Sequence, residues 1–170
     1  MNLFLLRHAK ACARGPKWRP DDTRPLTREG EKKMFAVARG IQSLDLSFDL
    51  ILTSPYLRAF RTAEILGEVF ESKKVFESKN LIAEAEPRAV IGEINENFPD
   101  LTQIVLVGHE PFLTRLISVL LSGKDGLSID LRKGGFCKLS VNKLSFGPCA
   151  RLDWLLTPRQ LARLGRGRKK

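Results

Sequence analysis

The sequence predicts an α/β fold: a three-layer α/β/α sandwich with a mainly parallel sheet and a C-terminal edge hairpin. Short apolar runs at residues 3–6, 50–53 and 104–107 are bounded by polar or turn-forming residues, which is typical of buried parallel strands. Segments with helical spacing alternate with these runs, and this alternation indicates helices on the faces of a sheet. A length of 170 residues with 43% hydrophobic residues suits one domain with a substantial core.

Each predicted element has a local cause. Thr27 is a good N-cap residue before a segment with helical apolar spacing, and Pro55 and Pro111 stand where proline opens helices. Alternating apolar residues near the C-terminus predict a hairpin at one sheet edge, and a stretch with three glycines before it predicts a loop. In chain order we expect strands at 3–6, 50–53, 75–76, 104–107, 136–141 and 151–156, helices after Thr27, at 56–70, around 90–98 and at 112–121, and loops at 11–24 and 124–135.

The formal net charge of +10 is concentrated at one end of the chain. Six of the 29 basic residues and none of the 19 acidic residues lie beyond Trp154. We therefore expect a single domain at residues 1–158 and a basic, flexible tail at residues 159–170. The tail lacks the aromatic side chains that stack on bases, so a nucleic-acid partner is disfavoured. A solvated tail and a weak contact with an acidic partner both remain open.

Localisation follows from features that the sequence lacks. No apolar run approaches the roughly 20 residues that a membrane span needs. The apolar run near the N-terminus is only four residues long and is closed by Arg7, unlike a signal peptide. Cys12, Cys137 and Cys149 form neither a metal-binding spacing nor an even disulfide framework. We expect a cytoplasmic protein with no membrane contact.

Polar side chains follow three of the predicted strands. Arg7 and His8 end the first, Ser54 and Arg58 follow the second, and His109 follows the third. Open α/β sheets bind ligands in the crevice beyond the carboxyl ends of their strands, so we expect these five residues to meet there. Two guanidiniums, two imidazoles and a hydroxyl, without a carboxylate, favour an anion.

The chemistry that this cluster supports is phosphoryl transfer. A neutral His8 imidazole can attack phosphorus, and Arg7 and Arg58 disfavour its protonated form while holding the non-bridging oxygens. His109 adds a further donor, and Ser54 a hydroxyl or backbone contact. The predicted route is covalent: the phosphoryl group moves to His8, and water then hydrolyses the phosphohistidine.

Two other uses of these residues are weaker. A metal site built on His8 and His109 lacks an evident third ligand, so we expect no metal and no cofactor. Ser54 lacks the G-x-S-x-G turn of a serine nucleophile and directly precedes Pro55, which favours a capping role.

Together these residues resemble the histidine phosphatase superfamily, which has a phosphoglycerate mutase-like fold, and especially its small SixA-type phosphohistidine phosphatases. The resemblance covers nearly the whole chain. It implies that Arg7, Arg58 and His109 bind phosphate and that His8 is phosphorylated. Ala9 and Glu110 depart from the commoner glycine and asparagine. The matching segments are Leu6-Arg7-His8-Ala9-Lys10, Arg24-Pro25-Leu26-Thr27 with Gly30, Ser54-Pro55-Tyr56-Leu57-Arg58-Ala59 with Thr62-Ala63, Val107-Gly108-His109-Glu110-Pro111, Gly134-Gly135, and Trp154-Leu155-Leu156-Thr157-Pro158.

The proton donor is left open between Glu84 and Glu86, which occupy the short segment where larger relatives carry an acid. Imidazole is a better leaving group than an alkoxide, so a site poor in general acid suits a phosphohistidine-bearing protein as substrate. The alternatives are a phosphatase for small phosphate monoesters and, in another class, a non-catalytic binding module that uses the basic tail. The short chain disfavours a phosphoglycerate mutase.

Overall fold

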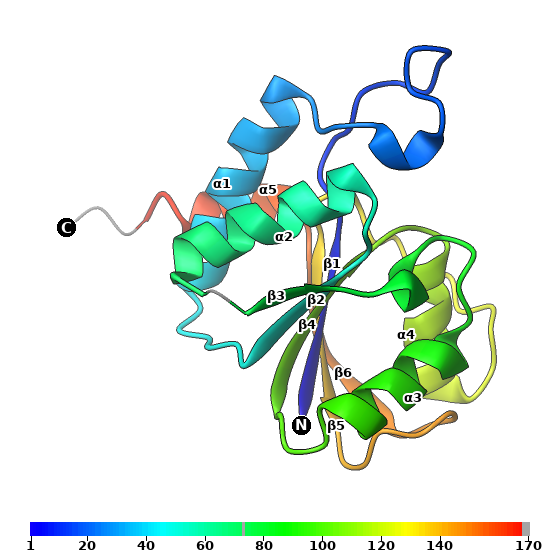
Figure 1. The fold of residues 1–170 in the computed structure, drawn as a ribbon. Helices are drawn as coiled ribbons and strands as arrows, with labels where there is room; N and C mark the ends of the chain where they lie inside the picture. The colour runs from blue at the N-terminus through cyan, green and yellow to red at the C-terminus, as the bar shows by residue number, and fades with distance from the viewer. Residues whose placement is uncertain (73, 168–170) are drawn as a thin grey trace.

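A mixed sheet lies at the centre of the computed structural model, which describes residues 1–72 and 74–167 (Figure 1). Within these residues the sheet has six strands in the order β3-β2-β4-β1-β5-β6. The first four in this order are parallel, and β5 and β6 form an antiparallel hairpin at one edge. The predicted fold class is confirmed. The strands are β1 (Asn2–Arg7), β2 (Leu50–Thr53), β3 (Val75–Glu77), β4 (Gln103–Gly108), β5 (Phe136–Val141) and β6 (Ala150–Leu156).

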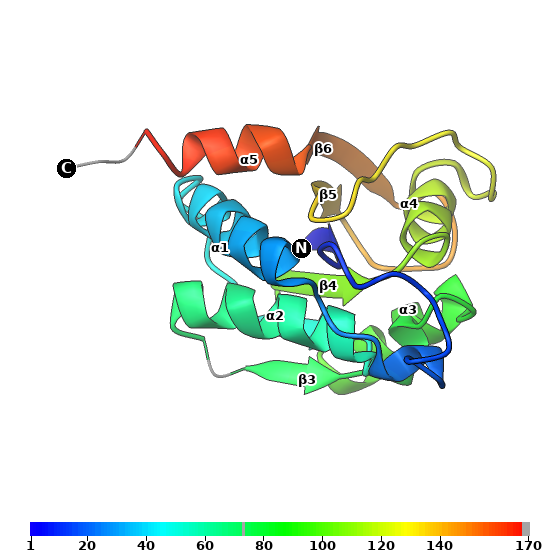
Figure 2. The same ribbon diagram turned by 90° about the horizontal axis from the view of Figure 1, so that it is seen from above.

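Helices cover both faces of the sheet (Figure 2). One face carries α1, α2 and α5, and the other carries α3 and α4. Both faces of β1 are buried: Leu3 and Leu5 pack toward α3 and α4, while Phe4 and Leu6 pack toward α1 and α2. This two-sided burial explains the continuous apolar runs of the sequence. The helices are α1 (Arg28–Gln42), α2 (Leu57–Phe70), α3 (Pro87–Asn97), α4 (Phe112–Ser122) and α5 (Pro158–Leu164), with 3-10 turns η1 (Asp21–Thr23) and η2 (Lys79–Leu81).

The helix ends follow local chemistry. The Thr27 side chain accepts a hydrogen bond from the Gly30 backbone N–H, which confirms the predicted cap of α1. At α5, Thr157 and Gln160 bond reciprocally as a capping box. No helix among the described residues has the length and apolarity needed to cross a membrane.

The predicted boundary between domain and tail is wrong for residues 159–164. These residues lie in α5, whose Leu161 is fully buried against α1. The sequence does not predict this helix, because one buried leucine among basic residues gives little apolar periodicity. The last residues of the predicted tail, 168–170, lie outside the described residues.

Strand register brings the predicted functional segments to one edge of the sheet. Arg7 of β1 pairs with Gly108 of β4, and Thr53 of β2 pairs with Val107. The backbone N–H of His8 donates to the Gly108 carbonyl at 3.0 Å, and that of Ser54 donates to the Val107 carbonyl at 2.9 Å. The residues that follow the three strands are therefore neighbours.

Candidate active site

A hollow of about 370 Å³ opens at the carboxyl ends of β1 and β4. Its lining includes Arg7, His8, Arg58 and His109, so the structure brings together four of the predicted site residues. The imidazole rings of His8 and His109 lie 5.0 Å apart between centroids. We call this cavity the histidine pocket.

The hydrogen bonding of His8 determines its tautomer. Its Nδ1 lies 2.7 Å from the Ala9 carbonyl oxygen, which can only accept, so Nδ1 carries the proton and the Nε2 lone pair is free. Burial, and then the charges of Arg58 and Arg7, lower the pKa of His8 to about 3. The backbone bond to Ala9 raises the pKa and is second only to burial, but it does not offset burial and the two charges together. His8 is therefore a neutral imidazole near pH 7.

His109 is held by Ser54. The Ser54 hydroxyl lies 2.8 Å from His109 Nε2 and also accepts a bond from the Tyr56 N–H at 3.3 Å. Because the hydroxyl accepts from Tyr56, we assign its proton to the bond with Nε2, which places the His109 proton on Nδ1. Burial, followed by the charges of His8 and Arg58, lowers the pKa of His109 to about 2.

Ser54 does not occupy the position predicted for it. It is fully buried behind His109 and does not line the histidine pocket, so the expected contact between its side chain and phosphate is wrong. The physical reason is that the Ser54 hydroxyl is already engaged by His109 Nε2 and by the Tyr56 N–H. The predicted capping role of Ser54 is wrong as well: the N-cap of α2 is Tyr56, which has no side-chain cap hydrogen bond, and the Ser54 hydroxyl accepts only from the Tyr56 N–H that precedes the helix.

The two arginines are anchored by oxygens of loops. Arg7 Nη1 donates to the Leu131 carbonyl at 2.9 Å. Arg58 donates from Nη1 to the Asp21 carbonyl at 2.8 Å and pairs through Nη2 with the Asp21 carboxylate at 3.0 Å. Fixed forks of this kind are suited to planar recognition of an oxyanion.

Sequence reasoning missed Asp21, Arg24 and Lys133. Arg24 lines the histidine pocket and donates from Nε to the Asp21 carboxylate at 2.9 Å. Burial alone would raise the pKa of Asp21, but its bond to Arg24 and the charge of Arg58 hold it below the usual value. Lys133 also lines the pocket, and burial and the neighbouring Arg7 lower its pKa. Only Arg24 left a signal in the sequence, as part of a segment shared with the resembling family.

Unpartnered polar atoms are concentrated in this site. Among the described residues, four buried side-chain atoms have no hydrogen-bond partner: Arg7 Nε, Arg58 Nε, His109 Nδ1 and Glu110 Oε1. All four belong to side chains that line the histidine pocket. Buried polar groups without partners are costly, and their clustering in one cavity is a mark of a functional site. Three of the four are donors, which suits an anionic ligand.

The predicted acids lie outside the pocket lining. Glu86 is exposed and pairs with Arg115, its Oε2 3.1 Å from Nη2. Glu84 is also exposed, although its charge contributes to the raised pKa of Tyr56 after the larger effect of burial. Glu110 lines the pocket instead, and its Oε2 accepts from the Thr114 hydroxyl at 2.5 Å. Burial raises the pKa of Glu110, so this carboxyl keeps its proton to a higher pH than an exposed one.

Comparison with known proteins identifies the family of the chain. A model of the histidine phosphatase superfamily (branch 1) matches residues 3–86. An uncharacterized protein of Picosynechococcus sp. is 37% identical over 147 residues, which cover 82% of this chain and 84% of that protein. The chain belongs to the histidine phosphatase superfamily. This membership assigns it a phosphatase activity.

Within the superfamily, the chain is similar to SixA. The phosphohistidine phosphatase SixA of Escherichia coli is 25% identical over 129 residues, which cover 73% of this chain and 76% of that protein. The structure of the protein histidine phosphatase SixA complexed with tungstate matches with a TM-score of 0.81 at 19% identity, covering 95% of this chain and 99% of that chain. The fold is therefore that of the SixA-type phosphatases.

Proposed function

We propose that this phosphatase hydrolyses phosphohistidine in proteins through a covalent phosphohistidine on His8. The observation that carries the proposal is a neutral imidazole beside three unpartnered buried donors in one pocket. A phosphoryl group brings three non-bridging oxygens, and the donors of Arg7, Arg58 and His109 match such an acceptor-rich group. Their roles in binding phosphate rest on this match.

In the first step His8 Nε2 attacks phosphorus, a P–Nε2 bond forms, and the P–N bond of the substrate breaks. The electron pair of the broken bond goes to the departing imidazole nitrogen, which must gain a proton. Positive charge gathers on His8 as it is phosphorylated, and the bond from Nδ1 to the Ala9 carbonyl stabilises that charge. The guanidiniums hold the charge of the transferring oxygens throughout.

In the second step water attacks phosphorus and the P–Nε2 bond breaks, which releases phosphate and restores neutral His8. We assign the proton transfers to Glu110 rather than to Glu84 or Glu86, because of the three only Glu110 lines the histidine pocket. Its raised pKa suits a donor that then acts as the base for water. A metal-independent reaction and a cytoplasmic location stay predictions from the sequence.

The similarity to SixA of Escherichia coli favours phosphohistidine over small phosphate esters as substrate. The test is a panel at equal concentration: a chemically phosphorylated histidine peptide, p-nitrophenyl phosphate and glycerol phosphate. We expect the highest kcat/KM for the phosphohistidine peptide. A higher value for either ester would support the small-molecule phosphatase, and no turnover of any of the three would support the binding module.

A further inference from the structure

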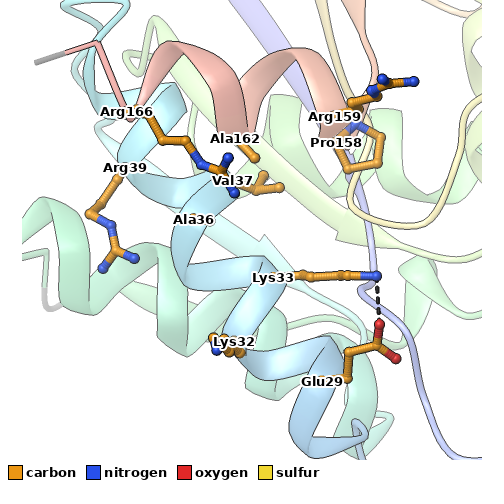
Figure 3. Close-up of a pocket in the computed structure, with 11 residues that line it drawn as sticks. Glu29, Lys32, Lys33, Ala36, Val37, Arg39, Pro158, Arg159, Ala162 and Arg166 are labelled. Carbon is orange, nitrogen blue, oxygen red and sulfur yellow. Dashed lines mark ion pairs between the residues drawn. The ribbon is translucent and has the colours of Figure 1, made fainter.

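A larger hollow, about 770 Å³, lies between α1 and α5 (Figure 3). We call it the α1–α5 groove. Its apolar lining comes from Ala36, Val37, Pro158 and Ala162. Its basic lining consists of Lys32, Lys33, Arg39, Arg159 and Arg166. Glu29 is the acidic residue of the lining, and it is already paired with Lys33 at 2.6 Å and with Lys10 at 2.7 Å.

The shape of the groove follows from a close helix contact at one end. A Cβ added at Gly40 of α1 would lie 1.9 Å from the Leu161 carbonyl oxygen of α5, and one added at Gly165 would lie 2.8 Å from the Gly40 nitrogen. The helices therefore touch there and diverge toward their N-terminal ends, as Figure 2 shows. From Glu29 to Arg39 the groove follows α1 for about 15 Å, the length of roughly ten helical residues.

A third hollow lies between the groove and the histidine pocket and shares lining residues with both. That hollow, about 480 Å³, shares Lys33, Val37 and Pro158 with the groove. It shares Arg7 and Lys133 with the histidine pocket. The three hollows therefore lie side by side, from the histidine pocket to α5.

The charges along this surface are strongly unbalanced. Lys32, Arg39, Arg159 and Arg166 are exposed and form no ion pair within residues 1–72 and 74–167. In the intermediate hollow, Asp130 is paired with Arg132 at 2.8 Å. The charged side chains of this surface that have no ion-pair partner are therefore basic. A partner with complementary charge is acidic.

We propose that the α1–α5 groove docks an acidic, partly apolar segment of the phosphoprotein substrate. The apolar lining together with its basic rim suits a peptide with both acidic and apolar side chains better than it suits a nucleic acid, because no aromatic side chain lines the groove for base stacking. This inference rests on the proposed function, since it adds the substrate class to the reaction at His8.

The test uses two 20-residue peptides with the same phosphohistidine, one followed by a segment of Glu and Leu and the other by the same segment with Ser for Glu. We expect K32E/R159E to lower kcat/KM for the acidic peptide at least about fivefold through KM, because two favourable charge contacts become repulsive. The rate on free phosphohistidine should not change. The matched control is K124E/K143E, which reverses two exposed charges that line none of the three hollows and should preserve the preference.

A binding measurement separates this inference from the proposed function. Fluorescence anisotropy of the unphosphorylated acidic peptide reports docking even if no phosphohistidine is hydrolysed. Weaker binding to K32E/R159E than to K124E/K143E supports the groove. Equal loss in both double variants, or tighter binding of a DNA oligonucleotide than of the peptide, overturns it.

Discussion

His8 and His109 end neighbouring strands after the same kind of apolar run, yet their hydrogen bonds give them different chemistry. The Ala9 carbonyl holds the His8 proton on Nδ1 and leaves Nε2 as a nucleophile. Ser54 contacts Nε2 of His109 and leaves Nδ1 as a buried donor without a partner. One imidazole is thus suited to attack phosphorus and the other to hold an oxygen of the phosphoryl group.

At Glu110 we expect a substitution to have an effect that depends on the leaving group. Glu110→Gln should lower kcat/KM for p-nitrophenyl phosphate only slightly, and for glycerol phosphate by about 10²-fold or more, because kcat/KM reports the phosphorylation of His8, in which an alkoxide needs a proton as it departs. Steady-state kinetics on both esters measures the difference. The matched control, Glu86→Gln, removes an exposed carboxylate paired with Arg115 and should leave both rates unchanged. A larger loss in the control would place the proton donor at Glu86.

The site residues at strand ends could be predicted from the sequence, whereas the site residues outside the strands could not. Arg7, His8 and His109 directly follow or end buried strands, and strand register brings such positions together. Asp21 and Glu110 could not be assigned in the same way. Asp21 lies in the short 3-10 turn η1, within a segment without apolar periodicity, and the role of Glu110 depends on burial and on the bond from Thr114.

Among the elements, the α1–α5 contact shows what sequence patterns leave out. The parallel strands and their helices were predictable because burial on both faces imposes apolar runs. The docking of α5 depends instead on one buried leucine and on glycines that allow two backbones to approach. Such a contact produces almost no apolar periodicity in the sequence. The sequence therefore predicts a basic tail for this segment.

We expect alanine substitutions at Gly40 and Gly92 to have opposite effects on the free energy of unfolding. Gly40→Ala should lower the free energy of unfolding by about 2 kcal/mol or more, because the added Cβ would overlap the Leu161 backbone. Gly92→Ala is the matched control, since nothing lies within 4 Å of a Cβ at that position of α3. It should raise the free energy of unfolding by about 0.5–1 kcal/mol through helix propensity. Urea denaturation measures both, and equal effects would contradict the packing described for α1 and α5.

For the whole molecule, two buried neutral imidazoles make stability sensitive to acid. The folded-state pKa values of His8 and His109, about 3 and about 2, lie below their ordinary value of 6.5. The unfolded chain therefore takes up protons first as the pH falls. The stabilising contribution of each neutral histidine is complete above about pH 6.5 and is lost progressively below it.

We expect the free energy of unfolding to fall between pH 6.5 and 5 by up to about 1.4 kcal/mol per pH unit for each histidine. The double variant His8→Asn/His109→Asn should show a shallower slope in urea titrations across this range. Comparing the two proteins at each pH cancels the opposite contribution of Glu110, whose raised pKa favours the folded state at lower pH. Identical slopes would show that the two histidines do not titrate as their burial requires.

Trapping the phosphorylated protein is the most direct test of the covalent step on His8. The protein is mixed with a ³²P-phosphohistidine peptide, quenched in alkali within milliseconds, and digested to locate the label. We predict acid-labile, alkali-stable label on the peptide that contains His8, and none in His8→Asn. Normal turnover by His8→Asn, or label confined to His109, would contradict the mechanism.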